Sequence, residues 1–207
     1  MRRSSLLSRG NTESFLGVWL SGYTNPKRFV DELREKPAPQ WGIYGQLLRA
    51  GLDSLLIYLP VTVMGRVPPT PSYLSFISTE RYYAALIVLT PLVLMFQTLV
   101  GASFLHVALR LSGRASDFDQ IVNLLGMAAL VVGAVLIPWD WFWFAVGGVD
   151  QYFLGFSHLV ISLWAALLIV LGLKRTLGIP VGLGVLLTLL TIPVGLPMAM
   201  MFMRSPF

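Results

Sequence analysis

Residues 120–138 read QIVNLLGMAALVVGAVLIP, a run of 19 residues without a charged side chain. A helix needs about 20 consecutive, mainly apolar residues to cross the hydrocarbon core of a bilayer. Soluble domains carry a charge at roughly one position in four, so an uncharged run of this length is not typical of them. The stretch therefore predicts a transmembrane helix.

Four more apolar runs, bounded by proline, glycine or charge, surround this one. They cover residues 41–64, 84–110, 152–173 and 180–203. The whole chain of 207 residues is 56% hydrophobic and only 12% charged, with a mean hydropathy of +0.73. We therefore expect an all-α membrane protein, a bundle of five transmembrane helices, with no room for a second folded domain.

The basic residues divide unevenly between the two faces that five spans would create. Eleven lie in the N-terminal tail or in the loops after the second and fourth spans, against three on the other face. Lys and Arg are enriched in cytoplasmic segments, so this division places the N-terminus in the cytosol and the C-terminus outside. The expected organisation is a cytosolic tail at 1–40, a membrane domain at 41–203 and a short outer tail at 204–207.

The tail contains a predicted amphipathic helix at residues 25–36. Asn25 is a favoured N-cap, and Pro26 is favoured at the first helical position. One face of this helix is apolar and is made by Phe29, Val30 and Leu33. Cations lie on or beside the opposite face, where each gains about 1 kcal/mol from anionic lipid headgroups: Lys27, Arg28 and Arg34. The simpler alternative is a helix that packs under the bundle and has no partner of its own.

Four local features are expected at the ends of the spans. The apolar residues 15–20 are too few to cross a membrane and are expected at the cytosolic membrane interface. Ser116 and Asp119 have the spacing of a capping box at the start of the third span. The Trp-rich residues 139–144 are expected to form an outer loop in the aromatic belt, with a re-entrant segment as the alternative. The fifth span holds two internal prolines, so its outer half is expected to be bent or partly unwound.

Polar residues inside the spans are the main functional candidates, because they are costly there. Arg49 and Asp53 are four residues apart, so they share one helix face and can form an ion pair. Either Arg49 reaches the cytosolic surface and Asp53 is its structural partner, or the pair is part of a proton or cation relay. His106 and His158 lie near opposite ends of their spans, so they are too far apart in depth to bind one metal ion.

The sequence contains no residue pattern typical of an active site. There is no cysteine, which excludes thiolate chemistry and zinc–thiolate sites. GFSHL at 155–159 fails the nucleophile-elbow pattern at its last position, and phosphate-loop, zincin and dinucleotide motifs are missing. We therefore expect a protein that is not an enzyme, with no catalytic residues, no cofactor, no metal and no nucleic-acid partner.

Three stretches of the chain carry a familiar pattern. They are TNPKRF at 24–29, GRASDF at 113–118 followed by NLLG at 123–126, and SLW at 162–164 followed by GLKR at 172–175 and by Gly178. In this order and spacing they resemble the Yip domain family of small polytopic membrane proteins. The resemblance implies a five-helix membrane domain with a cytosolic N-terminus, and it supplies no catalytic residues.

Eukaryotic members of that family are associated with Rab GTPases and with vesicle traffic at the endoplasmic reticulum and Golgi. The short tail and the Trp-rich segment of this chain depart from the eukaryotic pattern. They favour a prokaryotic-type member in the bacterial inner membrane, with the endoplasmic reticulum or Golgi as the alternative.

Two functions follow from these features. The first is a membrane scaffold that organises lipid, with a preference for anionic lipid, or recruits a membrane-protein partner or a second copy of itself. Its cytosolic face would consist of Asn25, Pro26, Lys27, Arg28, Phe29, Arg34, Arg114, Lys174 and Arg175. The second is a small transporter or ion-conducting protein that uses Asp53, Gln97 and His106.

Overall fold

The structure is a computed structural model that describes residues 14–36, 38–68, 73–146 and 150–202. Residues 1–13 of the predicted tail and the predicted outer tail at 204–207 lie outside the described residues. In chain order the elements are α1 (Phe15–Thr24), α2 (Pro26–Arg34), α3 (Gln40–Asp53), the π-helical turn η1 (Ser54–Tyr58), α4 (Leu59–Val63), the 3-10 turn η2 (Thr79–Arg81), α5 (Tyr82–Leu111), α6 (Phe118–Ala145), α7 (Gln151–Leu177) and α8 (Val181–Phe202).

Within the described residues, four helical segments are long and apolar enough to cross a membrane. They are Thr79–Leu111, Phe118–Ala145, Tyr152–Leu177 and Val181–Met198. These segments coincide with the predicted second to fifth spans, and the all-α membrane class is confirmed. On α5 the exposed Val88, Leu92 and Phe96 repeat every four residues, as expected where one helix face meets lipid acyl chains.

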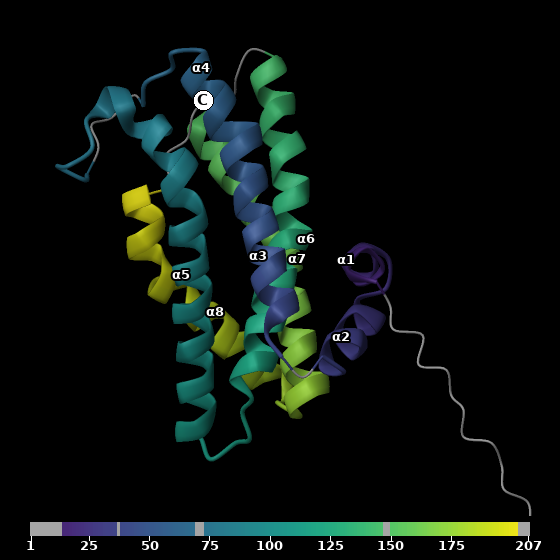
Figure 1. The fold of residues 1–207 in the computed structure, drawn as a ribbon. Helices are drawn as coiled ribbons and strands as arrows, with labels where there is room; N and C mark the ends of the chain where they lie inside the picture. The colour runs from purple at the N-terminus through teal and green to yellow at the C-terminus, as the bar shows by residue number, and fades with distance from the viewer. Residues whose placement is uncertain (1–13, 37, 69–72, 147–149, 203–207) are drawn as a thin grey trace, which may run out of the picture.

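The predicted first span is helical over residues 40–63, but it is divided into α3, η1 and α4. Its longest α-helix, α3, has 14 residues, fewer than the roughly 20 that a span needs. Pro60 contributes to the division, because it has no N–H to donate to the carbonyl of Leu56 four residues earlier. Trp141 of α6 donates its Nε1–H to that carbonyl over 2.7 Å. Helix α3 runs beside α6 (Figure 1), and η1 and α4 contact α5.

The Trp-rich segment is helical, so the prediction of an outer loop at 139–144 is wrong. Helix α6 continues through Pro138 as far as Ala145. Its aromatic rings pack against one another, with the Trp139 and Trp143 centroids 5.6 Å apart. The Trp139 Nε1–H donates to the Ser157 hydroxyl of α7 over 2.8 Å. The hydrogen bond holds the Trp139 indole against α7, and these contacts stabilise the two helical turns beyond the proline.

The start of α6 also differs from the prediction by one residue. Asp117, and not Ser116, is the N-cap, and its carboxylate accepts a hydrogen bond from the Gln120 N–H over 3.2 Å. Ser116 is hydrogen-bonded through Oγ to Nδ1 of His106, over 2.9 Å. The Ser116 side chain is therefore engaged with α5 and does not cap the helix.

Helix α8 is helical from Val181 to Phe202, through Pro193 and Pro197, so the expected unwinding does not occur. Proline is tolerated inside membrane helices when other groups satisfy the exposed backbone carbonyls. Gln97 of α5 also contacts the proline-containing part of α8, donating from Nε2 to the Gly195 carbonyl over 3.4 Å.

Helix α6 lies at the centre of the bundle, with α3, α5 and α7 around it (Figure 1). Helices α3 and α6 cross at Gly42 and Gly126, where a methyl group on either glycine would overlap the backbone of the other helix. Beside the crossing, Asn123 accepts from the Gly42 N–H over 2.8 Å and donates to the Ala38 carbonyl over 2.7 Å. Since Pro39 has no side-chain acceptor, Asn123 caps α3 from another helix.

Candidate functional site

The predicted tail helix is present as α2 and is docked on the side of the bundle. Asn25 caps it by accepting from the Arg28 N–H over 3.2 Å, and Pro26 occupies its first position. Its apolar face is turned toward α6 and α7, and the Phe29 side chain is completely buried. Phe29 is therefore a docking residue, which corrects its assignment to the exposed partner face.

Two side-chain contacts tie α1 and α2 to α7. Arg175 binds the Asp31 carboxylate with two hydrogen bonds, Nε to Oδ1 at 3.0 Å and Nη2 to Oδ2 at 2.7 Å. These bonds from Arg175 lower the pKa of Asp31 below its ordinary value, because they stabilise the ionised carboxylate. Trp164 donates its Nε1–H to the Gly22 carbonyl over 3.0 Å. Arg175 thus holds α2 in place, whereas the sequence suggested that it faces a partner.

Helices α1 and α2 contact both the start and the middle of α6. Gln120 donates to the Arg34 carbonyl at the end of α2 over 2.8 Å. Tyr23, near the end of α1, donates its hydroxyl to the Val131 carbonyl over 2.6 Å. Val131 is 13 residues beyond Phe118, or about 20 Å along the helix. The segment expected at the membrane interface is therefore packed against the side of the bundle, where α1 is seen nearly end-on in Figure 1.

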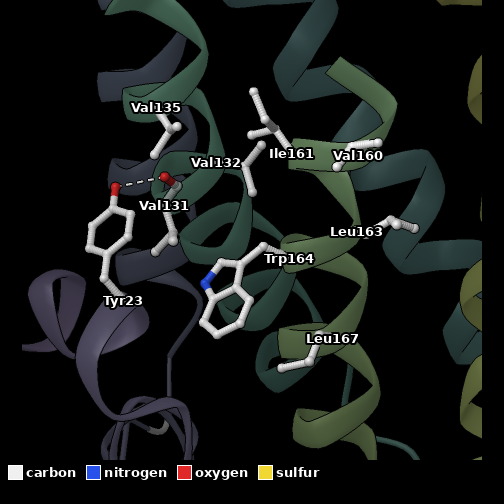
Figure 2. Close-up of a pocket in the computed structure, with 9 residues that line it drawn as sticks. All are labelled: Tyr23, Val131, Val132, Val135, Val160, Ile161, Leu163, Trp164 and Leu167. Atoms are coloured by element: carbon white, nitrogen blue, oxygen red, sulfur yellow. Dashed lines mark hydrogen bonds between the residues drawn. The ribbon is translucent and has the colours of Figure 1, made fainter. Parts of the chain in front are cut away.

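An apolar groove of about 390 Å³ lies beside this docking site (Figure 2). Tyr23 and Trp164 stand along it, and aliphatic side chains of α6 and α7, among them Val132 and Val160, form the remaining wall. A wall of this composition suits a hydrocarbon chain and offers few polar groups to orient a hydrophilic substrate.

Six of the predicted face residues are exposed cations: Lys27, Arg28, Arg34, Arg114, Lys174 and Arg175. They lie on α2, in the connection between α5 and α6, and in the last turns of α7. All three places are toward the lower end of the bundle in Figure 1. Arg175 is used to hold α2, and we define the other five exposed cations, Lys27, Arg28, Arg34, Arg114 and Lys174, as the basic face.

The residues Arg49 and Asp53 lie together on α3. Arg49 Nε is 3.6 Å from Asp53 Oδ2, and less than a fifth of each side chain is exposed. The Arg49 side chain lies over Gly133, where an added methyl group would meet its Cγ, Cδ and Nε within 2.8 Å. Gly133 is near the middle of α6, so Arg49 stays inside the bundle and does not extend to the cytosolic surface.

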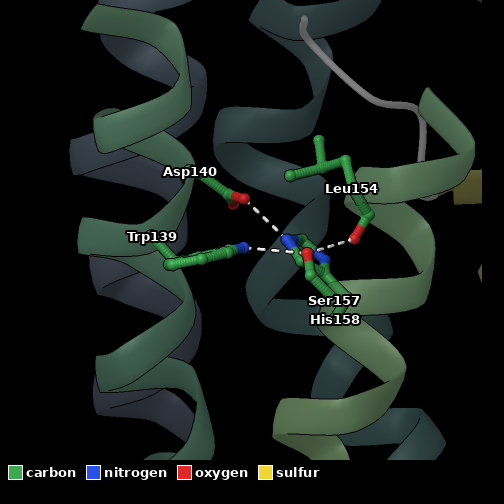
Figure 3. Close-up of polar contacts among 5 residues, drawn as sticks. All are labelled: Trp139, Asp140, Leu154, Ser157 and His158. Atoms are coloured by element: carbon green, nitrogen blue, oxygen red, sulfur yellow. Dashed lines mark hydrogen bonds and ion pairs between the residues drawn. The ribbon is translucent and has the colours of Figure 1, made fainter. Parts of the chain in front are cut away.

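Sequence reasoning missed a second polar pair, between α6 and α7. Asp140 Oδ1 and His158 Nε2 are 2.6 Å apart, one residue along each helix from the Trp139–Ser157 hydrogen bond (Figure 3). Ser157 in turn donates to the Leu154 carbonyl over 2.8 Å. The available signal was that Asp140 and His158 are both close to the outer ends of their helices. It was lost because residues 139–144 were predicted to be a loop.

The three residues of the predicted transport path have different neighbours. Asp53 pairs with Arg49, Gln97 contacts Gly195 of α8, and His106 contacts Ser116. Among the described residues, no three His, Asp or Glu side chains are grouped in a way that would hold a metal ion. The structure therefore places these three residues in three separate polar contacts.

A family model, the Yip1 domain, matches residues 21–203, which is nearly the whole chain. The chain belongs to the Yip1 domain family. Comparisons with curated proteins and with solved structures each gave no significant match. The Yip1 domain and the apolar helices together identify an integral membrane protein in contact with the lipid bilayer.

In this Yip1 domain protein, the three familiar stretches have structural roles that the contacts explain. Residues 24–29 begin α2 and bury Phe29. Residues 123–126 cap α3 and form its close crossing with α6. Trp164 and Arg175 hold α1 and α2 against α7. These contacts attach N-terminal helices to the bundle, whereas residues 113–118 cap α6 through Asp117 and bond to His106 through Ser116.

Proposed function

We propose that this protein is a non-enzymatic membrane scaffold of the Yip type. It crosses the bilayer five times, with its N-terminus in the cytosol of a bacterial cell and its C-terminus outside the inner membrane. It acts through the basic face, which attracts anionic lipid or the acidic surface of a membrane-protein partner. Residues 1–40 form the cytosolic tail, 41–203 the membrane domain and 204–207 the outer tail.

The length and position of residues 40–63 support the fifth crossing. At 1.5 Å per residue, 24 helical residues extend about 36 Å, more than the roughly 30 Å of a hydrocarbon core. The segment's α3 part packs along α6 and its η1 and α4 parts contact α5, and the exposed Leu48, Leu55 and Leu59 provide apolar contacts for lipid. Its polar residues Arg49 and Asp53 are paired, which lowers the cost of their burial.

The scaffold function is supported by one observation, the orientation in which α2 packs against the bundle. Its apolar face and Asp31 are used for docking, while Lys27, Arg28 and Arg34 are exposed. Arg114 belongs to the connection between α5 and α6 and Lys174 to the last turn of α7, and both segments are toward the same end of the bundle as α2 (Figure 1). A fixed helix with outward cations provides a preformed electropositive surface for headgroups or for a partner.

The decisive experiment neutralises the cations of α2. The variant K27Q/R28Q/R34Q is compared with R66Q/R81Q/R204Q, which removes the same charge from the opposite side. Each protein is reconstituted, and its association constant for spin-labelled phosphatidylglycerol is measured relative to phosphatidylcholine. At about 1 kcal/mol per cation, each replacement lowers the relative association up to about fivefold.

A protein partner is tested in the same variants by crosslinking from α2 in native membranes. The K27Q/R28Q/R34Q protein is expected to lose lipid preference, a crosslinked partner, or both, while the control keeps them. If this variant keeps the lipid preference and the crosslinked species of the wild type, the basic face has no such role.

A further inference from the structure

A second, partly open cavity of about 210 Å³ lies between α3, α5, α6 and α8. Its polar lining consists of Gln46, Arg49, Gln97, Thr98 and Thr191. Gln97 is midway along the 30 residues of α5, so the cavity is about 20 Å from either end of that helix. It is a polar space at the depth where a membrane protein is ordinarily apolar.

Two buried polar atoms in the lining are unsatisfied. Gln46 is 98% buried, and its Oε1 has no hydrogen-bond partner among the described residues. Arg49 Nε is also without a hydrogen-bond partner in that part of the chain, since Asp53 Oδ2 is 3.6 Å away. An unsatisfied buried group of this kind costs about 1–3 kcal/mol, so a bound molecule that supplies both a donor and an acceptor is favoured.

The two atoms belong to neighbouring side chains of one helix. Gln46 and Arg49 are three residues apart on α3, and side chains at that spacing are neighbours on the helix surface. Gln46 Oε1 requires an O–H or N–H donor, whereas Arg49 Nε–H requires an acceptor. A hydroxyl or a primary amide offers both functions within a single group.

The charge of the lining excludes most ions. Of the described residues that line the cavity, Arg49 alone is charged, and Asp53 beside it balances that charge. Because the two opposite charges largely cancel, neither an anion nor a cation gains enough attraction to offset the hydration that it loses at this depth. The remaining polar groups are the amide of Gln97 and the hydroxyls of Thr98 and Thr191. This lining suits an uncharged solute.

We propose that this cavity is a binding site for a small uncharged solute with adjacent hydroxyl or amide groups. Gln46 accepts a hydrogen bond from the solute, and Arg49 donates one to it. At about 30 Å³ per water molecule, the cavity has the volume of roughly seven waters, enough for a solute of a few heavy atoms. This site is separate from the basic face, and it is independent of the proposed scaffold function.

The absence of cysteine from the chain allows a direct test. Thr98→Cys places a thiol in the cavity wall, and Phe96→Cys places one on the exposed, lipid-facing side of the same helix. A hydrophilic methanethiosulfonate reagent reacts with thiolates, which form only in contact with water. The probes are glycerol and urea, each added at molar concentration to the protein in proteoliposomes.

Thr98→Cys is expected to react at least about tenfold faster than Phe96→Cys, because a hydrated cavity supports the thiolate. Glycerol or urea slows the labelling of Thr98→Cys, and the added change Gln46→Leu abolishes this protection while labelling continues. Equal labelling of the two cysteines, or labelling that neither solute slows, overturns the proposal.

If Thr98→Cys does not fold, Gly101→Cys serves as the second reporter. A Cβ at Gly101 meets only Leu125 Cδ1, at the ordinary contact distance of 3.7 Å, so the wall has room for the thiol. With this reporter, protection by glycerol or urea that Gln46→Leu abolishes supports the proposal, and labelling that neither solute slows overturns it.

Discussion

Replacing Asn123 by leucine should destabilise the protein more than its similar volume suggests. Asn123 is fully buried, and it joins α6 to the start of α3. Its Oδ1 accepts from the Gly42 N–H over 2.8 Å, and its Nδ2 donates to the Ala38 carbonyl over 2.7 Å. Leucine can make neither bond, and water has no space to replace them beside the Gly42–Gly126 crossing.

The magnitude follows from the two backbone groups left unsatisfied. The buried Gly42 N–H without a partner costs about 1–3 kcal/mol and the part-buried Ala38 carbonyl costs less, so Asn123→Leu should lower the free energy of unfolding by about 1–4 kcal/mol. Asn25→Ala gives a graded comparison, because it removes an exposed cap of α2 and should cost about 1 kcal/mol. Ser103→Ala changes an exposed residue and should alter stability by less than about 0.5 kcal/mol.

The free energy of unfolding is measured for the three variants by titrating the protein in dodecyl maltoside micelles with sodium dodecyl sulfate. The expected order of destabilisation is Asn123→Leu, then Asn25→Ala, then Ser103→Ala. An Asn123→Leu protein as stable as Ser103→Ala would refute the conclusion that Asn123 caps α3.

Three further predictions concern the attachment of the helices. The Phe29 ring is fully buried, so Phe29→Ala should lower the free energy of unfolding by about 3–5 kcal/mol and accelerate amide hydrogen exchange in α2. Exchange at the wild-type rate contradicts the docking of α2 through Phe29. Arg175 lowers the pKa of Asp31 in the folded protein below its ordinary 3.8. Their ion pair therefore stabilises α2 fully above pH 3.8, and this stabilisation is lost as the pH falls through the pKa that Asp31 has in the folded protein. Protection of α2 should therefore drop below about pH 4 in the wild type, whereas Asp31→Asn should weaken it at neutral pH and remove the drop. Gly126→Ala should displace a helix and lower the free energy of unfolding by at least about 1–3 kcal/mol. Gly155 has open space around it among the described residues, so Gly155→Ala should leave stability unchanged or raise it. Equal melting temperatures for the two variants exclude a tight crossing.

Local sequence rules predicted what local forces determine. The uncharged runs predicted the second to fifth helices, because transfer of apolar residues into lipid depends on composition and length. Asn25 and Pro26 predicted the start of α2, because capping involves residues three positions apart. The spacing of Arg49 and Asp53 placed the pair on one helix face for the same reason.

The errors occurred where a distant residue supplied a contact. Pro138 was expected to end its helix, but Trp139 and Trp141 bind Ser157 and Leu56 and keep the segment helical. Ser116 was assigned to a capping box, but its hydroxyl is bonded to His106 of the preceding helix. In each case a hydrogen bond between helices changed the role that the local pattern indicated.

The sequence by itself determined that this protein is a membrane protein of the Yip type and that its cations are concentrated in the tail and two loops. The tertiary structure decided which of those residues remain exposed. Phe29 is buried, Arg175 is paired with Asp31, and Gln46 and Arg49 border a polar cavity. The reason is physical: composition and periodicity act over a few residues, whereas Asp31 and Arg175 are 144 positions apart and meet only when the helices pack.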